Sequence, residues 1–125
     1  MYSERLLQRF HEPSWAGDLD APTSVATAGN PTCGDVVQIG VEVADGIVVR
    51  ARFRTLGCAI AIASSDAVCD LVAGMPVYEA MLLTTGDVAA ALGGIPDDRA
   101  PCASGALAAL RSALRAPAVQ DPGPA

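Results

Sequence analysis

The sequence predicts an α+β fold in which a small antiparallel sheet of about three strands packs against several helices. Two neighbouring segments alternate apolar and polar residues with a period of two, and a glycine-containing turn joins them, which is typical of a hairpin. The segments after this hairpin carry apolar residues at helical spacing, and one short helix precedes it. An order of helix, sheet and then several helices favours helices packed on one face of the sheet.

The hairpin is expected over residues 37–43 and 47–54. Ala44-Asp45-Gly46 between these segments supplies a turn in which glycine can adopt a positive φ. A shorter third strand is expected over residues 23–28. The apolar side chains of the hairpin that are expected to face the core are Val37, Ile39, Val41, Val43, Ile47, Val49, Ala51 and Phe53.

Helices are expected on both sides of the hairpin. Ser3 is the expected N-cap of a first helix, which Pro13 ends. Helical spacing begins again at Gly57-Cys58, and the helix that it predicts ends at Gly74. On this helix Ile60, Ala63, Ala67 and Leu71 are expected to face the core, with Ser65 and Asp66 on the other side. Further helices are expected at Val77–Leu83, at Asp87–Leu92 and from near Pro101 to Arg115.

The length of 125 residues fits one domain with one core. We expect this domain over residues 1–116 and a disordered tail, rich in proline, glycine and alanine, over residues 117–125. No apolar run approaches the ~20 residues of a membrane span, and residues 1–12 do not resemble a signal peptide. We therefore expect a cytoplasmic protein without a membrane segment.

Composition excludes several classes of function. Fourteen acidic and eight basic residues give a net charge of −6, which disfavours binding to nucleic acid or to an anionic membrane. Every basic residue is an arginine, so a lysine nucleophile is excluded, and the single histidine, His11, excludes a site with two imidazoles. Arg50, Arg52 and Arg54 line one face of the hairpin and either are simply solvated or dock an acidic partner.

Three of the four cysteines are expected in a loop or at a helix start. Cys33 follows a glycine and a proline and lies two residues before Asp35. Cys58 and Cys102 are expected at helix N-termini, where free backbone N–H groups and the helix dipole favour a thiolate. Because a thiolate is both the nucleophile and the metal ligand, these residues are either a metal site completed by the aspartate or three unrelated thiols.

The fourth cysteine, Cys69, lies inside the helix that Cys58 begins. The helical rise separates the two residues by about 16 Å, which is too far for a disulfide within an intact helix. We expect Cys69 to be partly buried and to serve packing.

Several segments match one known family in order and spacing. They are Tyr2-Ser3-Glu4, Cys33-Gly34-Asp35, Ala51-Arg52-Phe53, Gly57-Cys58, Ala61-Ile62-Ala63-Ser64-Ser65 and Cys102. Over roughly residues 1–116 the chain resembles the IscU/NifU-type iron–sulfur cluster assembly scaffold family. The cysteine–glycine–aspartate and glycine–cysteine segments are specific in combination. The family also has the order of helix, sheet and helices predicted above.

The resemblance implies a scaffold rather than an enzyme. Such a scaffold accepts sulfur from a cysteine desulfurase, assembles a [2Fe–2S] cluster and transfers it to acceptor proteins. The resemblance implies Cys33, Asp35, Cys58 and Cys102 as the metal ligands, with Cys102 also the persulfide acceptor. Thiolates suit such a cluster, whereas the carboxylate of Asp35 is a harder and poorer ligand that favours release.

The chain departs from the family pattern at two places. Pro101 occupies the position of the usual histidine before the last cysteine, so that imidazole ligand is absent. Ile95-Pro96-Asp97-Asp98-Arg99 replaces the stretch that a dedicated DnaK-like chaperone recognises, so dependence on such a chaperone is not implied. Arg99 takes the place of the family lysine and either orients a persulfide or pairs with Asp35, or else is a solvated loop residue.

Other functions remain open at this point. A zinc-bound sulfur acceptor that stimulates a desulfurase, as in the SufU branch, needs no histidine, because three cysteines and an aspartate complete a tetrahedral site. Asn30-Pro31-Thr32 favours that branch, whereas the absence of an insertion between Cys58 and Cys102 opposes it. A degenerate binding module without metal is a third hypothesis. A cysteine hydrolase is disfavoured because only His11 could serve as its base.

Overall fold

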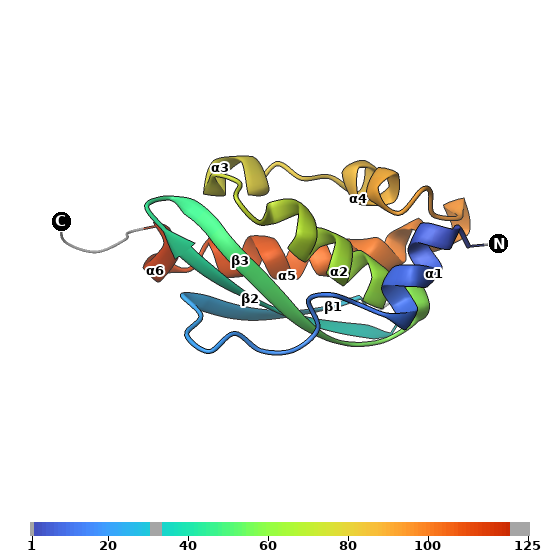
Figure 1. Ribbon diagram of the computed structural model, residues 1–125, viewed down its shortest axis with the longest axis horizontal. Coiled ribbons are helices and arrows are strands. Elements are labelled where there is room, and N and C mark those ends of the chain that lie inside the picture. The colour runs from blue at the N-terminus through green and yellow to red at the C-terminus, as the bar shows by residue number, and fades with distance from the viewer. Residues whose placement is uncertain (1, 31–33, 121–125) are drawn as a thin grey trace.

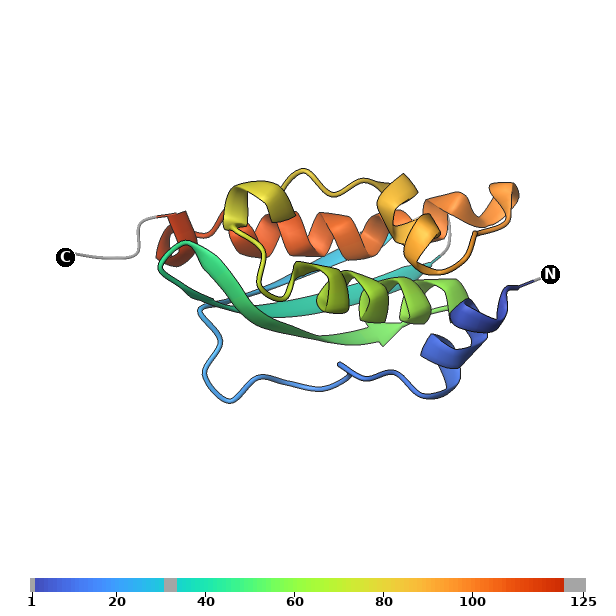
Figure 2. The same ribbon diagram turned by 45° about the horizontal axis from the view of Figure 1, so that its top comes forward.

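The computed structural model of the chain describes residues 2–30 and 34–120 and has two layers, a sheet and a set of helices on one of its faces (Figures 1 and 2). In chain order the elements are α1 (Glu4–His11), β1 (Ser24–Asn30), β2 (Asp35–Ala44), β3 (Ile47–Leu56), α2 (Ala59–Val72), α3 (Val77–Ala80), α4 (Thr85–Ala91), the 3₁₀ helix η1 (Asp97–Ala103), α5 (Ser104–Leu114) and α6 (Pro117–Gln120). The predicted α+β class is confirmed. Within the described ranges, no helix is long and apolar enough to cross a membrane.

The sheet has three antiparallel strands in the order β1-β2-β3. The turn between β2 and β3 has positive φ at both central residues, 54° at Asp45 and 74° at Gly46. Positive φ at both positions matches the right-handed twist of a hairpin, so the sequence signal for this turn is confirmed. The third strand, β1, is also present and extends two residues beyond its predicted end.

A register shift in the hairpin overturns part of the predicted core. The pairing of β2 with β3 slips between Glu42 and Val43, so that Val43 lies opposite Val48. Such a bulge reverses which side chains face inward beyond it. Val48 is therefore fully buried, whereas Ile47 and Val49, predicted to face the core, are each 36% exposed.

The helices α2 and α5 cover the inner face of the sheet, α2 against β3 and α5 against β1 and β2 (Figure 2). The predicted apolar face of the last helix is confirmed, because Leu107, Leu110 and Leu114 are fully buried. This helix begins at Ser104 rather than near Pro101, since the preceding turn is 3₁₀. The helices α3 and α4 form a strap across the outside of this layer (Figure 1).

The side of α2 that was predicted to face solvent is buried. Ser65 and Asp66 are at most 1% exposed, because β3 contacts Ser65, whereas α1 and the segment after it contact Asp66. Ser65 Oγ donates to the Ala61 carbonyl at 2.7 Å and shares a hydrogen bond with Thr55 of β3. Cys69 is likewise buried, at 1% exposure, so the expectation of partial burial was wrong. Burial, followed by the charge of Asp66, raises the pKa of the Cys69 thiol far above its ordinary value.

The segment after α1 lies beside the free edge of β3. The Phe53 N–H donates to the Trp15 carbonyl, and the Gly17 N–H donates to the Phe53 carbonyl. The three arginines of this hairpin face, expected either to be solvated or to dock an acidic partner, have partners within the chain. Arg54 makes a bidentate pair with Asp18 at 2.7 Å, Arg52 donates to the Ala16 carbonyl at 3.0 Å, and Arg50 pairs with Glu42 at 3.3 Å.

The last helical turn, α6, comprises Pro117–Gln120, which belong to the expected tail. Val119 of this turn is 6% exposed and joins the core. The remaining tail residues, 121–125, lie outside the described residues.

Candidate metal centre

Three of the four predicted ligands converge at one end of the sheet. Asp35 is the first residue of β2, Cys58 is the N-cap of α2, and Cys102 lies in η1. A carboxylate oxygen and the two Sγ atoms all lie within 4.8 Å of one another. The fourth predicted ligand, Cys33, lies outside the described residues.

The strand register brings the first two of these residues together. Val36 of β2 pairs with Leu56 of β3, so the residue before Val36 and the residue after Leu56 lie side by side. That neighbour of Asp35 is Gly57, and Cys58 follows it directly. The start of β2 therefore lies beside the end of β3, where the chain continues into α2.

Asp35 is held in place by the backbone of α2. Its side chain is buried at 2% exposure, and its Oδ1 accepts a hydrogen bond from the Cys58 N–H at 3.1 Å. The other oxygen, Oδ2, lies 3.9 Å from Cys58 Sγ. One oxygen therefore accepts the backbone N–H of the N-cap residue, and the second oxygen faces the Cys58 sulfur.

Cys102 reaches the same place from the helical layer. η1 packs against α2, which sets Cys102 beside the N-terminus of α2 at 2% exposure. The prediction that Cys102 lies in the first turn of an α-helix was wrong, since it lies in the 3₁₀ turn that precedes α5. Pro101 belongs to the same 3₁₀ turn.

The donor set fits a thiophilic metal. Two sulfur atoms and one carboxylate oxygen converge, and all three residues come from segments that the sheet and α2 hold in place. Thiolates bind zinc and iron–sulfur clusters well, and a carboxylate oxygen is accepted as a further ligand.

Two other residues considered from the sequence are not part of this cluster. Arg99 is exposed in η1, and among the described residues its side chain pairs with no carboxylate, Asp35 included. His11 is exposed at the end of α1. Cys69, as expected, is a core residue in the body of α2 rather than a member of the site.

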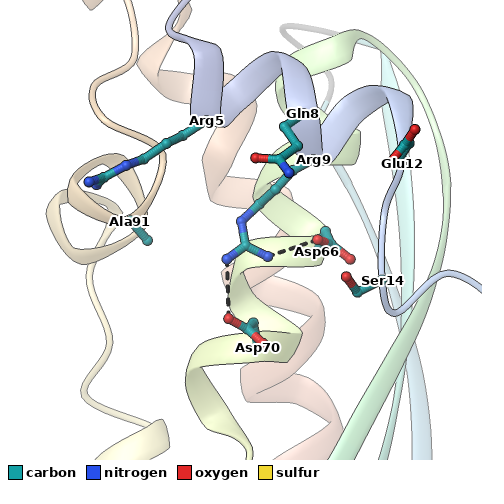
Figure 3. A pocket seen from close by; sticks show the side chains of 8 residues that line it. All are labelled: Arg5, Gln8, Arg9, Glu12, Ser14, Asp66, Asp70 and Ala91. Carbon is teal, nitrogen blue, oxygen red and sulfur yellow. Dashed lines mark hydrogen bonds and ion pairs between the residues drawn. The ribbon is translucent and has the colours of Figure 1, made fainter.

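A second polar cluster, which the sequence patterns did not predict, ties α1 to α2 (Figure 3). Arg9 donates to Asp66 at 2.8 Å and to Asp70 at 3.1 Å. The two carboxylates also accept hydrogen bonds from the backbone N–H and the indole N–H of Trp15, respectively. Asp66 and Asp70 are one helical turn apart, which indicates that they could share a partner. The sequence does not identify that partner, because Arg9 and Trp15 are distant along the chain.

Arg9 remains charged in this cluster. Burial lowers the pKa of Arg9, but its hydrogen bonds to Asp66 and Asp70 and their charges outweigh burial and raise it. A neighbouring pocket of about 360 Å³ is lined by this cluster together with Arg5, Gln8, Glu12, Ser14 and Ala91. Because the two acids are already paired with Arg9 and Trp15, the cluster is structural.

Comparison with known proteins identifies the family. The profile of the NifU-like N-terminal domain matches residues 1–118. An iron–sulfur cluster assembly scaffold protein IscU of Archaeoglobus fulgidus is 38% identical over 114 residues, which are 91% of this chain and 74% of that protein. A nitrogen fixation protein NifU of Cereibacter sphaeroides is 38% identical over 112 residues, which are 90% of this chain and 46% of that protein.

A solved structure shows the same fold. It is a candidate iron–sulfur cluster assembly scaffold protein for the SUF system from Fervidobacterium islandicum, with a TM-score of 0.75 and 22% identity over 91% of this chain and 96% of that chain. The fold, the Cys-Gly-Asp and Gly-Cys segments and the profile match agree. The chain belongs to the NifU-like N-terminal domain family, whose relatives include the IscU and NifU proteins.

Proposed function

We propose that this chain is a scaffold on which an iron–sulfur cluster is assembled and from which the cluster is passed to acceptor proteins. The observation that carries the proposal is the convergence of Asp35, Cys58 and Cys102, whose ligand atoms lie within 4.8 Å of one another. This convergence occurs in a chain whose relative in A. fulgidus is named as such a scaffold. The cluster is cargo rather than a resident cofactor, and we propose that it is a [2Fe–2S] cluster held with Cys33 as the fourth ligand.

The mixed donor set suits temporary binding. Thiolates bind iron and sulfide strongly, whereas a carboxylate oxygen is a harder ligand that exchanges more readily. One oxygen of Asp35 already accepts the Cys58 N–H, so the other oxygen, Oδ2, is better placed to bind a cluster. A cluster held in this way is stable enough to assemble and labile enough to leave.

Sulfur delivery is proposed at Cys102. The Cys102 thiolate attacks the outer sulfur of a persulfide on a cysteine desulfurase, which forms a new S–S bond on Cys102. The S–S bond on the desulfurase breaks in the same step, and its cysteine leaves as a thiolate. In this proposal the desulfurase performs the enzymatic step and the chain acts as acceptor and scaffold.

An exposed apolar pair beside the centre supports docking of such partners. Val36 and Leu56 are cross-strand neighbours on the outer face of the sheet, 46% and 79% exposed. They adjoin Asp35 and Gly57, so a protein that covers them is brought next to the candidate centre. We propose that the chain meets its desulfurase and acceptors in the cytoplasm. The proposal does not require a DnaK-like chaperone.

Anaerobic reconstitution with iron and sulfide tests the proposed function. The wild-type chain is expected to develop a two-iron chromophore, which Cys58→Ala lacks because it loses a ligand. Cys69→Ala is the matched control, since Cys69 is a core residue outside the site. Visible absorption and elemental analysis measure the result. A Cys58→Ala chain that reconstitutes like the wild type contradicts the proposal.

The zinc-bound sulfur acceptor is the second candidate. It is favoured by Pro101, which leaves three cysteines and an aspartate as a complete tetrahedral set without histidine. Stoichiometric zinc that survives purification, with no cluster formed on reconstitution, would establish this function instead. Absence of both metals would leave a binding module without metal.

A further inference from the structure

The most unusual packing at the centre involves a glycine and not a ligand. A Cβ atom built on Gly57 would lie 2.7 Å from the carboxyl carbon of Asp35 and 3.0 Å from its Cβ, and it would overlap Oδ1 directly. Real Cβ atoms do not approach other atoms so closely, so any larger residue at this position must displace the carboxylate.

Gly57 is required for space and not for its backbone conformation. Its φ lies outside the left-handed region, unlike those of Gly34 and Gly46, which are 71° and 74°. The backbone at this position is therefore accessible to alanine, and the three atoms nearest to the new Cβ all belong to the Asp35 side chain.

The space left by the absence of a side chain at Gly57 determines how the Asp35 carboxylate is oriented. The carboxylate lies against the backbone of Gly57, where Oδ1 accepts the Cys58 N–H and Oδ2 is left 3.9 Å from Cys58 Sγ. The hydrogen bond from the N-cap residue Cys58 draws negative charge toward Oδ1, so Oδ2 is the weaker donor that faces the sulfur. Displacement of the carboxylate would remove both effects.

We propose that Gly57 is a positioning residue that holds Asp35 as a one-oxygen, readily released ligand of the cargo. This inference deepens the proposed scaffold function and rests on it for the effect on release. The hydrogen bond from Cys58 to Asp35 is independent of any cargo, so the positioning role can be measured separately.

The Gly57→Ala variant tests the proposal in the apo chain first. In Gly57→Ala and in Asp35→Ala, the Cys58 amide proton is expected to move upfield in the NMR spectrum, because its hydrogen bond to the carboxylate is lost. Gly86→Ala is the matched control. It adds the same methyl group in α4, where the new Cβ makes only an ordinary contact of 3.5 Å with Thr84. A Cys58 amide proton that stays in place in Gly57→Ala overturns the proposal.

Transfer of the assembled cluster is the second measurement. Gly57→Ala is expected to slow transfer to an apo-ferredoxin on the order of tenfold, as loss of a supporting contact at a metal centre does. Because Gly57 acts through Asp35, the double variant with Asp35→Ala should be no slower than Asp35→Ala alone. If the fold-decreases in transfer rate caused by the two substitutions multiply in the double variant, Gly57 does not act through Asp35.

Two further outcomes remain informative. If Gly57→Ala does not fold, the double variant with Asp35→Ala is expected to recover folding, because the overlapping carboxyl atoms are removed. Failure of that rescue also overturns the proposal. If the wild-type chain assembles no cluster, the scaffold function fails, and the Cys58 amide proton alone decides whether Gly57 positions Asp35.

Discussion

At the scale of single residues, the candidate centre combines donors of unlike chemistry. Asp35 is buried at 2% exposure, with one oxygen on the backbone N–H of Cys58 and the other facing the Cys58 sulfur. Cys58 and Cys102 supply soft sulfur donors from two different segments. The hard oxygen of the aspartate and the soft sulfur atoms of the cysteines should have different roles, release and retention of the cluster, and single substitutions can distinguish them.

Asp35→Ala is expected to slow cluster transfer to an apo-ferredoxin on the order of tenfold. The carboxylate is the weakest of the proposed ligands, so an acceptor replaces it on the cluster most easily. Without the carboxylate, an acceptor must instead replace a more strongly bound thiolate. Transfer is measured by circular dichroism of the cluster. Asp20→Ala, which removes the same charge from an exposed loop, serves as control. A transfer rate unchanged by Asp35→Ala would contradict the proposed role of Asp35 as a labile ligand.

Cys102→Ser is expected to abolish sulfur acceptance. A serine hydroxyl cannot attack a persulfide at neutral pH, whereas a thiolate can. Mass spectrometry after incubation with a desulfurase and cysteine reports the addition of one sulfur atom. Cys58→Ala should still accept sulfur, which separates this role from general damage to the site. Persulfide at normal yield on the Cys102→Ser chain would refute the assignment.

At the scale of elements, α1 is attached to the rest of the fold mainly along one side of α2. Leu6 is the one fully buried side chain within α1, and Arg9 reaches from the next turn to two acids of α2. Asp66 is 1% exposed, whereas the side chain of Asp70 is 50% exposed. The same arginine therefore makes one buried and one solvated ion pair, and the two should differ in strength.

Asp66→Ala is expected to lower the free energy of unfolding by about 3 kcal/mol, because it leaves the Trp15 N–H and part of Arg9 without a partner away from water. Asp70→Ala is the matched substitution at the solvated position, and a loss of at most about 1 kcal/mol is expected there. Urea unfolding followed by far-UV circular dichroism measures both. Equal losses, or a larger loss in Asp70→Ala, would contradict the buried network.

At the scale of the whole molecule, the candidate centre is a junction of both layers. The sheet supplies Asp35, the strand-to-helix connection supplies Cys58, and the helical layer supplies Cys102. Residues far apart along the chain meet there because α2 packs against β3 and η1 packs against α2. Ligand geometry at this junction therefore depends on how the two layers pack, and a change in their packing alters the centre.

Sequence periodicity was most reliable where one element has one neighbour. The hairpin, its turn at Asp45-Gly46 and the apolar face of α5 follow from patterns of two and of 3.6 residues. It failed where an element is covered from two sides. Asp66 was expected on the side of α2 away from the core and Cys69 was expected to be only partly buried, yet both are at most 1% exposed and α1 packs against α2.

The sequence by itself determined the fold class and the family resemblance, from which the ligand residues are proposed, because these depend on residue type and local spacing. Only the tertiary structure decided the slip between Glu42 and Val43 and the overlap that a side chain at Gly57 would cause. Both depend on atoms brought together by strand pairing across the hairpin. Local periodicity does not encode the distance between such atoms, so packing alone establishes that Asp35 rests against a glycine.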